Sequence, residues 1–365
     1  MKSRKSRLSK KGRYVGETFK SVVLTIYKNE VQPIESVGQH EINSVAFLAD
    51  GKHIVSGGKE GMIRRWRVED GKEVETPMDA RSDVNNIAVS RDGKWIVSGT
   101  ISGELMVWDA KSELKVTEWK GHSDWVVAVD VSPDGKRIAT GSNDATLCVW
   151  SLWTGKRLLG PLEHKDSVVA AKFSPNGCFI ATAAWLPNSV RIYNSQSGDL
   201  LVDLPVGVAS RFNQSLVWAS NSKNLFALSH GKINYIDAST GTTLSSWSIP
   251  SSSAFGCIAL PNKGTFIAAS ADSSVSFWDT TTHKQIGSII NHTHNIESMA
   301  ISANYDFVIG GGKAITLRNV CDELPSSYCE DVSALPRRFV VRDLFLITNH
   351  LADCNRFSVS EKSSA

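Results

Sequence analysis

Four histidines recur at equivalent places in this sequence, and a histidine can act as a metal ligand or as a general base. They are His40, His122, His164 and His292, each just ahead of an apolar run. A zinc site needs ligands a few residues apart or several ligands that converge on one point. One such histidine stands in each of four units of about 42 residues. This spacing favours four structural histidines, each inside its own unit, over one shared metal site.

Sequence motifs of the common catalytic sites are absent. The chain has no G-x-S-x-G nucleophile motif, no H-E-x-x-H zinc motif, no P-loop and no G-x-G-x-x-G ahead of a helix. The run of glycines at 310–312 falls in a predicted strand turn. We therefore predict no catalytic residue, no cofactor and no metal site.

The elements that position the histidines come from a repeat of about 42 residues. Its marker is a turn whose clearest copies are Asp50-Gly51, Asp92-Gly93, Asp134-Gly135 and Asn176-Gly177. Weaker copies near residues 222, 263 and 305 bring the number of turns to seven. An Asp-Gly or Asn-Gly pair between apolar runs predicts a β-hairpin, because both residues tolerate the positive φ of a type I′ turn. Each unit should therefore contain antiparallel strands.

The third unit contains four predicted strands and no helical periodicity. Its apolar runs are 126–131, 137–140, 146–150 and 157–162. One sheet of this size cannot bury its faces alone. Copies arranged in a closed ring cover one another's faces and leave only short edges exposed.

The same unit carries the motifs of a known family. These are Gly121-His122, Pro133-Asp134-Gly135-Lys136, Asn143-Asp144 and Trp150, and literal Trp-Asp pairs occur at 108–109 and 278–279. With seven such units in phase, the chain resembles the WD-repeat β-propellers over roughly residues 20–320. The resemblance implies an all-β fold, a seven-bladed β-propeller of four-stranded antiparallel blades.

The resemblance also implies a structural role for the histidines. In this family a histidine, a hydroxyl of the second strand, an acid of the next turn and a tryptophan form a hydrogen-bonded chain inside one blade. The matching residues are His122, Thr140, Asp144 and Trp150 in the third unit, and His40, Ser56, Glu60 and Trp66 in the first. Such a chain satisfies buried polar groups, each of which would otherwise cost roughly 1–3 kcal/mol.

In the family, the loops at one rim of the propeller are the common binding face. The matching positions here are Lys59, Arg81, Asp83, Trp125, Asn143, Trp185, Arg211, Phe212, Ala271 and Asn295. We expect Trp125 and Trp185 to be exposed, and exposed aromatic residues are enriched at binding hot spots. This mixture fits a protein or peptide partner better than a phosphate backbone, which needs a continuous basic stripe.

Composition narrows the class of protein. No run approaches the roughly 20 apolar residues of a membrane-spanning helix, and no apolar segment follows the basic N-terminus as in a secretory signal. The six cysteines lack CxxC spacing, which suits a reducing compartment better than a disulfide framework. We therefore expect an intracellular protein, cytoplasmic or nuclear, that forms a monomeric ring without membrane contact.

Basic residues are concentrated at the N-terminus. Residues 1–13 hold seven Lys or Arg and no acid, whereas residues 14–365 hold 33 basic and 37 acidic residues. A body without a basic excess gives no electrostatic footprint for nucleic acid, so only residues 1–13 could provide one. A nuclear-import signal and a merely solvated tail are the alternatives.

The repeats divide the chain into three parts: a basic, disordered tail (1–19), the propeller (20–320) and a C-terminal extension (321–365). In the extension, residues 338–351 fit a helix or two strands equally well. Both ends of the propeller should complete one blade, with 33–37 as its outer strand. Residues 22–27 resemble a third strand, although 295–319 already supply the inner part of that blade.

Three functions are compatible with these observations. The first, which we take as the working interpretation, is a non-enzymatic scaffold that binds protein or peptide partners through the rim loops. The second is a propeller enzyme or small-ligand binder that uses the central channel, with Asp83 and Glu297 as its readable titratable groups. The third is a nuclear or nucleic-acid-associated factor directed by the basic tail.

Overall fold

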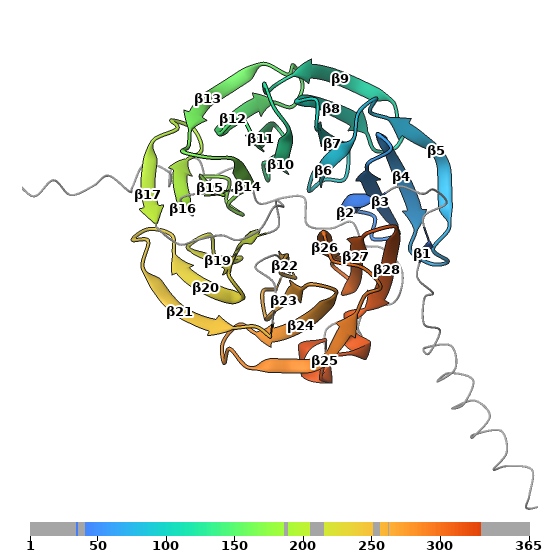
Figure 1. The fold of residues 1–365 in the computed structure, drawn as a ribbon, viewed down its shortest axis with the longest axis vertical. Helices are drawn as coiled ribbons and strands as arrows, with labels where there is room; N and C mark the ends of the chain where they lie inside the picture. Colours follow the sequence, from blue (N-terminus) through green and yellow to red (C-terminus); the bar gives the residue numbers. More distant parts are fainter. Residues whose placement is uncertain are drawn as a thin grey trace, which may run out of the picture.

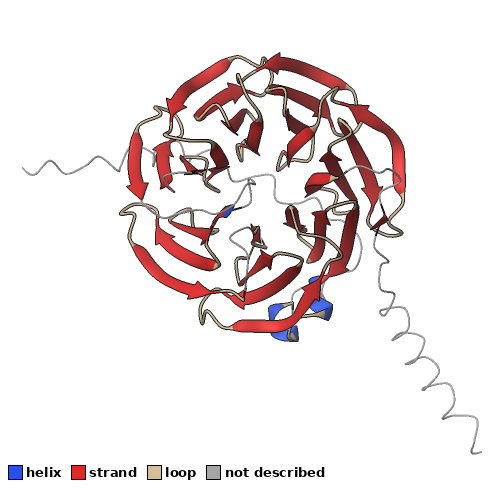
Figure 2. Ribbon diagram, in the orientation of Figure 1, coloured by secondary structure: helices blue, strands red, loops and turns tan. Residues whose placement is uncertain are grey.

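The computed structural model describes residues 34–35, 41–185, 189–204, 215–250, 256–261 and 263–329. In this part of the chain, seven four-stranded antiparallel sheets surround a common centre (Figures 1 and 2). The first strand of each sheet lies nearest the centre and the fourth lies on the outside. The prediction of a seven-bladed β-propeller is confirmed.

The first four blades follow the chain without interruption. Blade 1 contains β2 (Ile42–Phe47), β3 (His53–Gly58), β4 (Met62–Arg67) and β5 (Glu73–Asp79). Blade 2 contains β6 (Val84–Val89), β7 (Trp95–Thr100), β8 (Glu104–Asp109) and β9 (Lys115–Lys120). Blade 3 contains β10 (Val126–Val131), β11 (Arg137–Ser142), β12 (Thr146–Ser151) and β13 (Arg157–Glu163). Blade 4 contains β14 (Val168–Phe173), β15 (Phe179–Ala184), β16 (Ser189–Asn194) and β17 (Leu200–Leu204).

The last three blades have shorter inner strands. Blade 5 contains β18 (Leu216–Trp218), β19 (Asn224–Ser229), β20 (Lys232–Asp237) and β21 (Thr243–Ser248). Blade 6 contains β22 (Ile258–Ala259), β23 (Phe266–Ala271), β24 (Ser274–Asp279) and β25 (Gln285–Asn291). Blade 7 contains β26 (Ser298–Ile301), β27 (Asp306–Gly311), β28 (Ala314–Asn319) and, from the other end of the chain, β1 (Ile34–Glu35).

The marker turn joins the first two strands of a blade, as predicted, but it is not a two-residue type I′ turn. In blade 3 the connection between β10 and β11 spans five residues, and Gly135 N–H donates to the Ser132 carbonyl at 2.8 Å. Gly135 has a φ of 68°, whereas Asp134 is not among the residues with positive φ. The longer loop therefore needs one left-handed position, which glycine supplies without steric cost.

Neighbouring blades pack through a glycine of the second strand and a valine of the next first strand. A Cβ added to Gly99 of β7 would lie 2.5 Å from a methyl carbon of Val126, which is fully buried. Gly57 and Gly141 face Val84 and Val168 in the same way, at 2.6 Å. The blades can approach this closely because the second strand lacks a side chain there.

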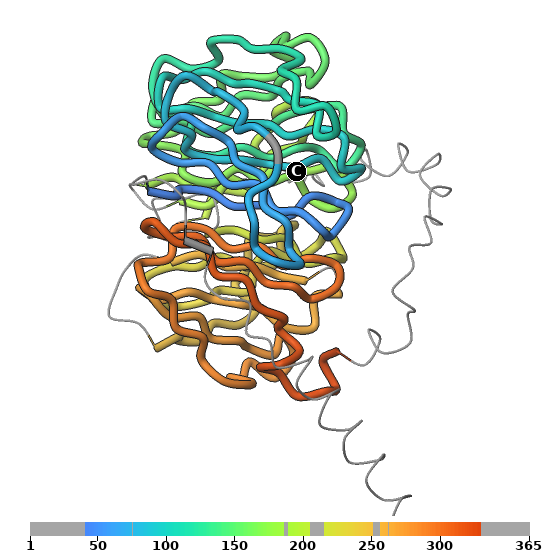
Figure 3. Tube along the Cα trace, turned by 90° about the vertical axis from the view of Figure 1, so that its right-hand side faces the viewer, coloured from blue at the N-terminus to red at the C-terminus, as the bar shows by residue number. Residues whose placement is uncertain are grey.

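The two ends of the chain close the ring in blade 7. Strand β1 pairs with β28 through Ile34 opposite Ile315 and Glu35 opposite Ala314. Blade 7 also joins blade 1 directly, because Val45 N–H donates to the Ser298 hydroxyl at 3.0 Å. In Figure 3 the first blade, in blue, lies beside the last, in red. Strand β28 is thus the third strand of this blade, and residues 22–27, the competing prediction, lie outside the described residues.

Beyond β28 the chain packs against blade 6 in two short 3₁₀ turns, η2 (Val320–Asp322) and η3 (Ser326–Tyr328). The Tyr328 hydroxyl donates to an Asp279 carboxylate oxygen at 2.7 Å. Cys321 and Cys329 form a disulfide, and Cys178 is also disulfide-bonded, so the expectation of unpaired cysteines is wrong for these three. The turns bring the Cα atoms of Cys321 and Cys329 to 5.9 Å, a proximity that the sequence spacing does not reveal. Residues 338–351 lie outside the described part.

Candidate functional site

Three sets of equivalent residues from blades 1 to 4 meet at one end of the ring. The first set precedes the first strand: Glu41, Asp83, Trp125 and Ser167. The second set lies in the first strand: Asn43, Asn85, Val127 and Val169. The third set follows the second strand: Lys59, Ile101, Asn143 and Trp185. Backbone N–H groups of the third set donate to carbonyls of the first set at 2.9 to 3.0 Å, so the hairpins hold both sets together.

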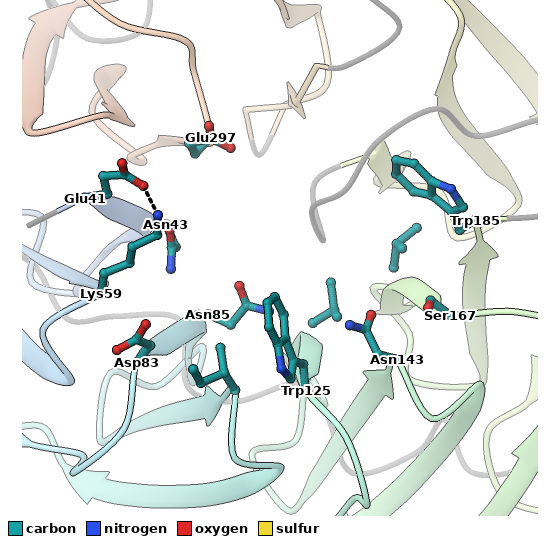
Figure 4. Close-up of a pocket in the computed structure, with 13 residues that line it drawn as sticks. Glu41, Asn43, Lys59, Asp83, Asn85, Trp125, Asn143, Ser167, Trp185 and Glu297 are labelled. Atoms are coloured by element: carbon teal, nitrogen blue, oxygen red, sulfur yellow. Dashed lines mark ion pairs between the residues drawn. The ribbon is translucent and has the colours of Figure 1, made fainter.

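Together with Glu297 of blade 7, these residues line a cavity of about 630 Å³ (Figure 4). We call this cavity and its thirteen lining residues the channel mouth. A site of this volume is in the range of ligand pockets in proteins.

Two asparagines of the channel mouth connect adjacent blades. The Asn43 side-chain nitrogen donates to the Val84 carbonyl at 3.1 Å, and that of Asn85 donates to the Val126 carbonyl at 3.2 Å. Each bond runs from one first strand to the next. These bonds hold the two amides at the inner surface of the ring.

The charged residues of the channel mouth are mostly acidic. Lys59 forms an ion pair with Glu41, and Asp83 and Glu297 lie in the same lining. The hydrogen bond from Lys59 lowers the pKa of Glu41, which keeps its carboxylate ionised. The hydrogen bond to Glu41 raises the pKa of Lys59, and the charges of Asp83 and Glu297 add to this shift. The channel mouth therefore presents three carboxylates and one ammonium group.

Two tryptophans give the channel mouth its aromatic surface. Trp125 is 47% exposed, as expected for an anchor residue. Trp185 was also expected to be exposed. Instead it is half-buried, because it packs against an apolar cluster that includes Val169 and Val190. That cluster lies between blades 4 and 5, and a single sequence does not show that the indole lies over it.

The structure brings five of the predicted rim residues together in the channel mouth: Lys59, Asp83, Trp125, Asn143 and Trp185. Arg81 is exposed and pairs with Glu118 at 3.4 Å, away from this lining. Asn295 is exposed outside it, and Ala271 is buried, so Ala271 is not a rim contact. Arg211 and Phe212 lie outside the described residues.

Sequence reasoning missed the acid and the amides at the inner end of the first strands. Glu41, Asn43 and Asn85 were not named as rim residues, although the repeat spacing could have identified them. Asn43 and Asn85 are 42 residues apart, as are Glu41 and Asp83. Glu297 occupies in blade 7 the position of Asn43, because it precedes Ser298 as Asn43 precedes Ser44.

The hydrogen-bonded chain of blade 3 is complete. One ring nitrogen of His122 lies 2.7 Å from the Thr140 hydroxyl and the other 2.9 Å from an Asp144 carboxylate oxygen. The Trp150 indole donates to the same hydroxyl at 2.8 Å. Burial alone would raise the pKa of Asp144, but hydrogen bonds from His122 and Thr146 hold it well below its usual range. The polar groups of these side chains thus bind one another inside the blade.

Blade 1 has a shorter version of this chain. The Trp66 indole donates to the Ser56 hydroxyl at 2.8 Å. The Glu60 carboxylate accepts from Arg64 at 2.8 Å, and Arg64 also pairs with Glu73 at 2.6 Å. The fourth predicted member, His40, lies outside the described residues. Glu60, which stands where blade 3 has an aspartate, thus pairs with Arg64 of the third strand.

Among the residues that the structure describes, no three His, Cys, Asp or Glu side chains are placed to hold a metal ion. In the same residues, no helix is both long and apolar enough to span a membrane. The channel mouth combines three carboxylates and three amides with apolar and aromatic side chains, which are Ile101, Val127, Val169, Trp125 and Trp185. This lining offers carboxylate and amide oxygens beside an aromatic surface.

The chain is similar in sequence and in fold to known WD-repeat proteins. A family model described as "WD domain, G-beta repeat" matches residues 31–67, 71–109, 113–151, 156–194 and 241–279, more than half of the chain. The solved structure "Crystal structure of RRP9 WD40 repeats" is 18% identical with a TM-score of 0.66, over 80% of this chain and 98% of that chain. "Structure of U3-55K" is also 18% identical with a TM-score of 0.66, over 78% and 96%. A comparison with curated protein sequences found no match. At this identity the structural likeness establishes the fold alone.

Proposed function

Because the chain belongs to the WD-repeat family, we propose that it is a non-enzymatic scaffold that binds a protein or peptide partner at the channel mouth. The observation that carries the proposal is Trp125, a large aromatic side chain left 47% exposed at the edge of the cavity. Burying such a side chain in a partner's pocket is a common source of interface affinity. The surrounding carboxylates and amides supply the polar contacts that fix orientation.

The chemistry of the channel mouth supports binding rather than catalysis. General acid-base catalysis needs a group that exchanges a proton near the working pH. The Glu41 carboxylate is held ionised by Lys59, and the lining contains no histidine or cysteine. His122 and Asp144, a pair with catalytic side-chain types, are engaged with Thr140 and Trp150 inside blade 3.

Affinity purification tests the proposal. The tagged full-length protein is compared with Trp125→Ala and with Trp153→Ala, a matched control. Trp153 is 54% exposed, but it lies in the connection between β12 and β13, at the other end of the blade 3 strands. We expect a near-stoichiometric partner to be lost with Trp125→Ala and kept with Trp153→Ala. Retention of every partner by Trp125→Ala, with unchanged folding, would refute the proposal.

We further propose that the protein acts inside the cell. The basic run within residues 1–13 and the two buried free thiols, Cys148 and Cys257, support this location. The disulfide between Cys321 and Cys329 and the disulfide bond of Cys178 are the opposing observations. Microscopy of a tagged protein tests the location, and deletion of residues 1–13 tests whether the basic run directs nuclear import. If the protein's distribution in the cell is unchanged after this deletion, the basic run is a solvated tail and not an import signal.

A further inference from the structure

The channel mouth has two chemically different walls (Figure 4). Blades 7, 1 and 2 contribute the carboxylates of Glu297, Glu41 and Asp83. Blades 3 and 4 contribute the indoles of Trp125 and Trp185, with Val127 and Val169 in the first strands beside them. A ligand that fills the cavity must therefore suit anionic and aromatic groups together.

The charge of the lining disfavours an anionic ligand. Lys59 is the only cationic side chain among the thirteen lining residues, and Glu41 already pairs with it. The carboxylates of Asp83 and Glu297 then give the lining an excess of two negative charges. A phosphate or an acidic peptide would meet like charges in a confined space, which is unfavourable.

The lining includes several hydrogen-bond acceptors in addition to its carboxylates. Each side-chain nitrogen of Asn43 and Asn85 donates one N–H to a carbonyl of the next blade, which fixes the amide, and the amide oxygens can accept from a ligand. Asp83 lies half-buried at the same level of the ring. A neutral apolar ligand would bury these acceptors without a donor, which is costly.

We propose that the channel mouth receives an arginine or lysine side chain from a peptide segment of the partner, an inference that rests on the proposed function. A cationic group satisfies the carboxylates and also stacks favourably on an indole face. The aliphatic stem of such a side chain can pack along Val127 and Val169 while its charged end reaches the acidic wall. The occupant is thus a basic segment of another protein.

The test begins with a library of random dodecapeptides displayed on phage. The library is selected on the immobilised full-length protein and depleted on the Trp125→Ala variant. Peptides that survive therefore need the channel mouth. We expect them to share one position that is enriched in arginine or lysine, and exchange of that residue for glutamine should weaken binding about tenfold.

A matched pair of charge variants then locates the contact. Asp83→Asn removes one negative charge from the channel mouth and keeps the shape of the side chain. Glu69→Gln removes the same charge from the exposed turn between β4 and β5, at the other end of the blade 1 strands. By fluorescence polarisation, the selected peptide should bind Asp83→Asn about five- to tenfold more weakly, and Glu69→Gln within about twofold of the wild type.

The outcomes separate this inference from the proposed function. Selected peptides that need Trp125 but show no basic enrichment, or that bind Asp83→Asn as tightly as the wild type, overturn the inference and leave the scaffold function standing. A library that yields no peptide dependent on Trp125 overturns both. Equal weakening by Asp83→Asn and Glu69→Gln would show attraction to the general surface charge, which also overturns the inference.

Discussion

At the scale of single residues, Thr140 holds the hydrogen-bonded chain of blade 3 together, because its hydroxyl contacts both His122 and Trp150. Valine has a shape similar to threonine but no hydroxyl. The Thr140→Val variant therefore leaves the Trp150 N–H and one His122 nitrogen without this hydrogen-bond partner. We expect the free energy of unfolding to fall by about 2–5 kcal/mol, measured by denaturant titration. Thr140→Ser keeps the hydroxyl and should lose only about 1 kcal/mol. Equal losses in the two variants would contradict the structural role of this hydroxyl.

His164 of blade 4 should make stability depend on pH. Burial, and secondarily the charge of Arg191, lowers the pKa of His164 to about 4 from 6.5. The neutral ring fits its site, with one nitrogen 3.2 Å from the Leu162 carbonyl and the other 3.0 Å from the Thr182 hydroxyl. As the pH falls from 6.5 to 4, the unfolded chain takes up the proton first, so the free energy of unfolding falls, by up to about 3 kcal/mol.

Denaturation at several pH values between 7 and 4 checks this expectation against His164→Gln, which cannot titrate. The wild type should lose more stability than His164→Gln across this window. Burial also lowers the pKa of His292, so its protonation reduces stability at low pH as well. This loss is the same in both proteins and cancels when their pH profiles are compared. Parallel pH profiles would show that His164 is not held neutral by the fold.

At the scale of elements, the packing of one blade on the next depends on a missing side chain. Gly99→Ala would place a Cβ 2.5 Å from Val126 and 2.9 Å from Val129, both fully buried. Overpacking of this kind typically costs about 1–3 kcal/mol. Val126→Ala should also destabilise the protein, because it leaves a cavity. In the double variant the new Cβ fills part of this cavity, so the loss of stability should be smaller than the sum of the two single losses. Strict additivity in denaturant unfolding would mean that these residues do not meet.

The elements themselves were largely predictable from sequence. The four runs of the third unit became β10 to β13 within two residues at each end, because alternating apolar residues and Asp-Gly turns are local signals. Distant contacts were not predictable in this way. The disulfide between Cys321 and Cys329 and the packing of Trp185 depend on tertiary placement, which no local pattern encodes.

At the scale of the whole molecule, β1 should act as a clasp, since it is the fourth strand of blade 7. Removing residues 1–38 would expose the edge of β28, and exposed edges promote aggregation. We expect the truncated protein to melt well below the full-length chain or to be insoluble. Removing residues 355–365 should have little effect. Equal melting temperatures for the full-length and N-terminally truncated proteins would show that the ring closes in another way.

The candidate site was predictable only in part, because it belongs to the ring rather than to any one repeat. The loops named from the family resemblance supplied five of its residues: Lys59, Asp83, Trp125, Asn143 and Trp185. Of the three carboxylates, Asp83 and Glu297 were named from sequence but Glu41 was missed, and Glu297 meets Glu41 only when blade 7 closes against blade 1. Closure therefore connects the stability of the ring to the shape of its binding site.

The most direct measurement of the central claim, that a partner contacts the channel mouth, is site-specific photo-crosslinking. A benzophenone amino acid is placed at position 143, in the channel mouth, or at position 153, at the other end of the same blade. Each full-length protein is irradiated in cell extract, and crosslinked products are resolved by mass. We expect a discrete partner adduct from position 143 and none from position 153. An adduct from position 153 with none from position 143 would contradict the claim.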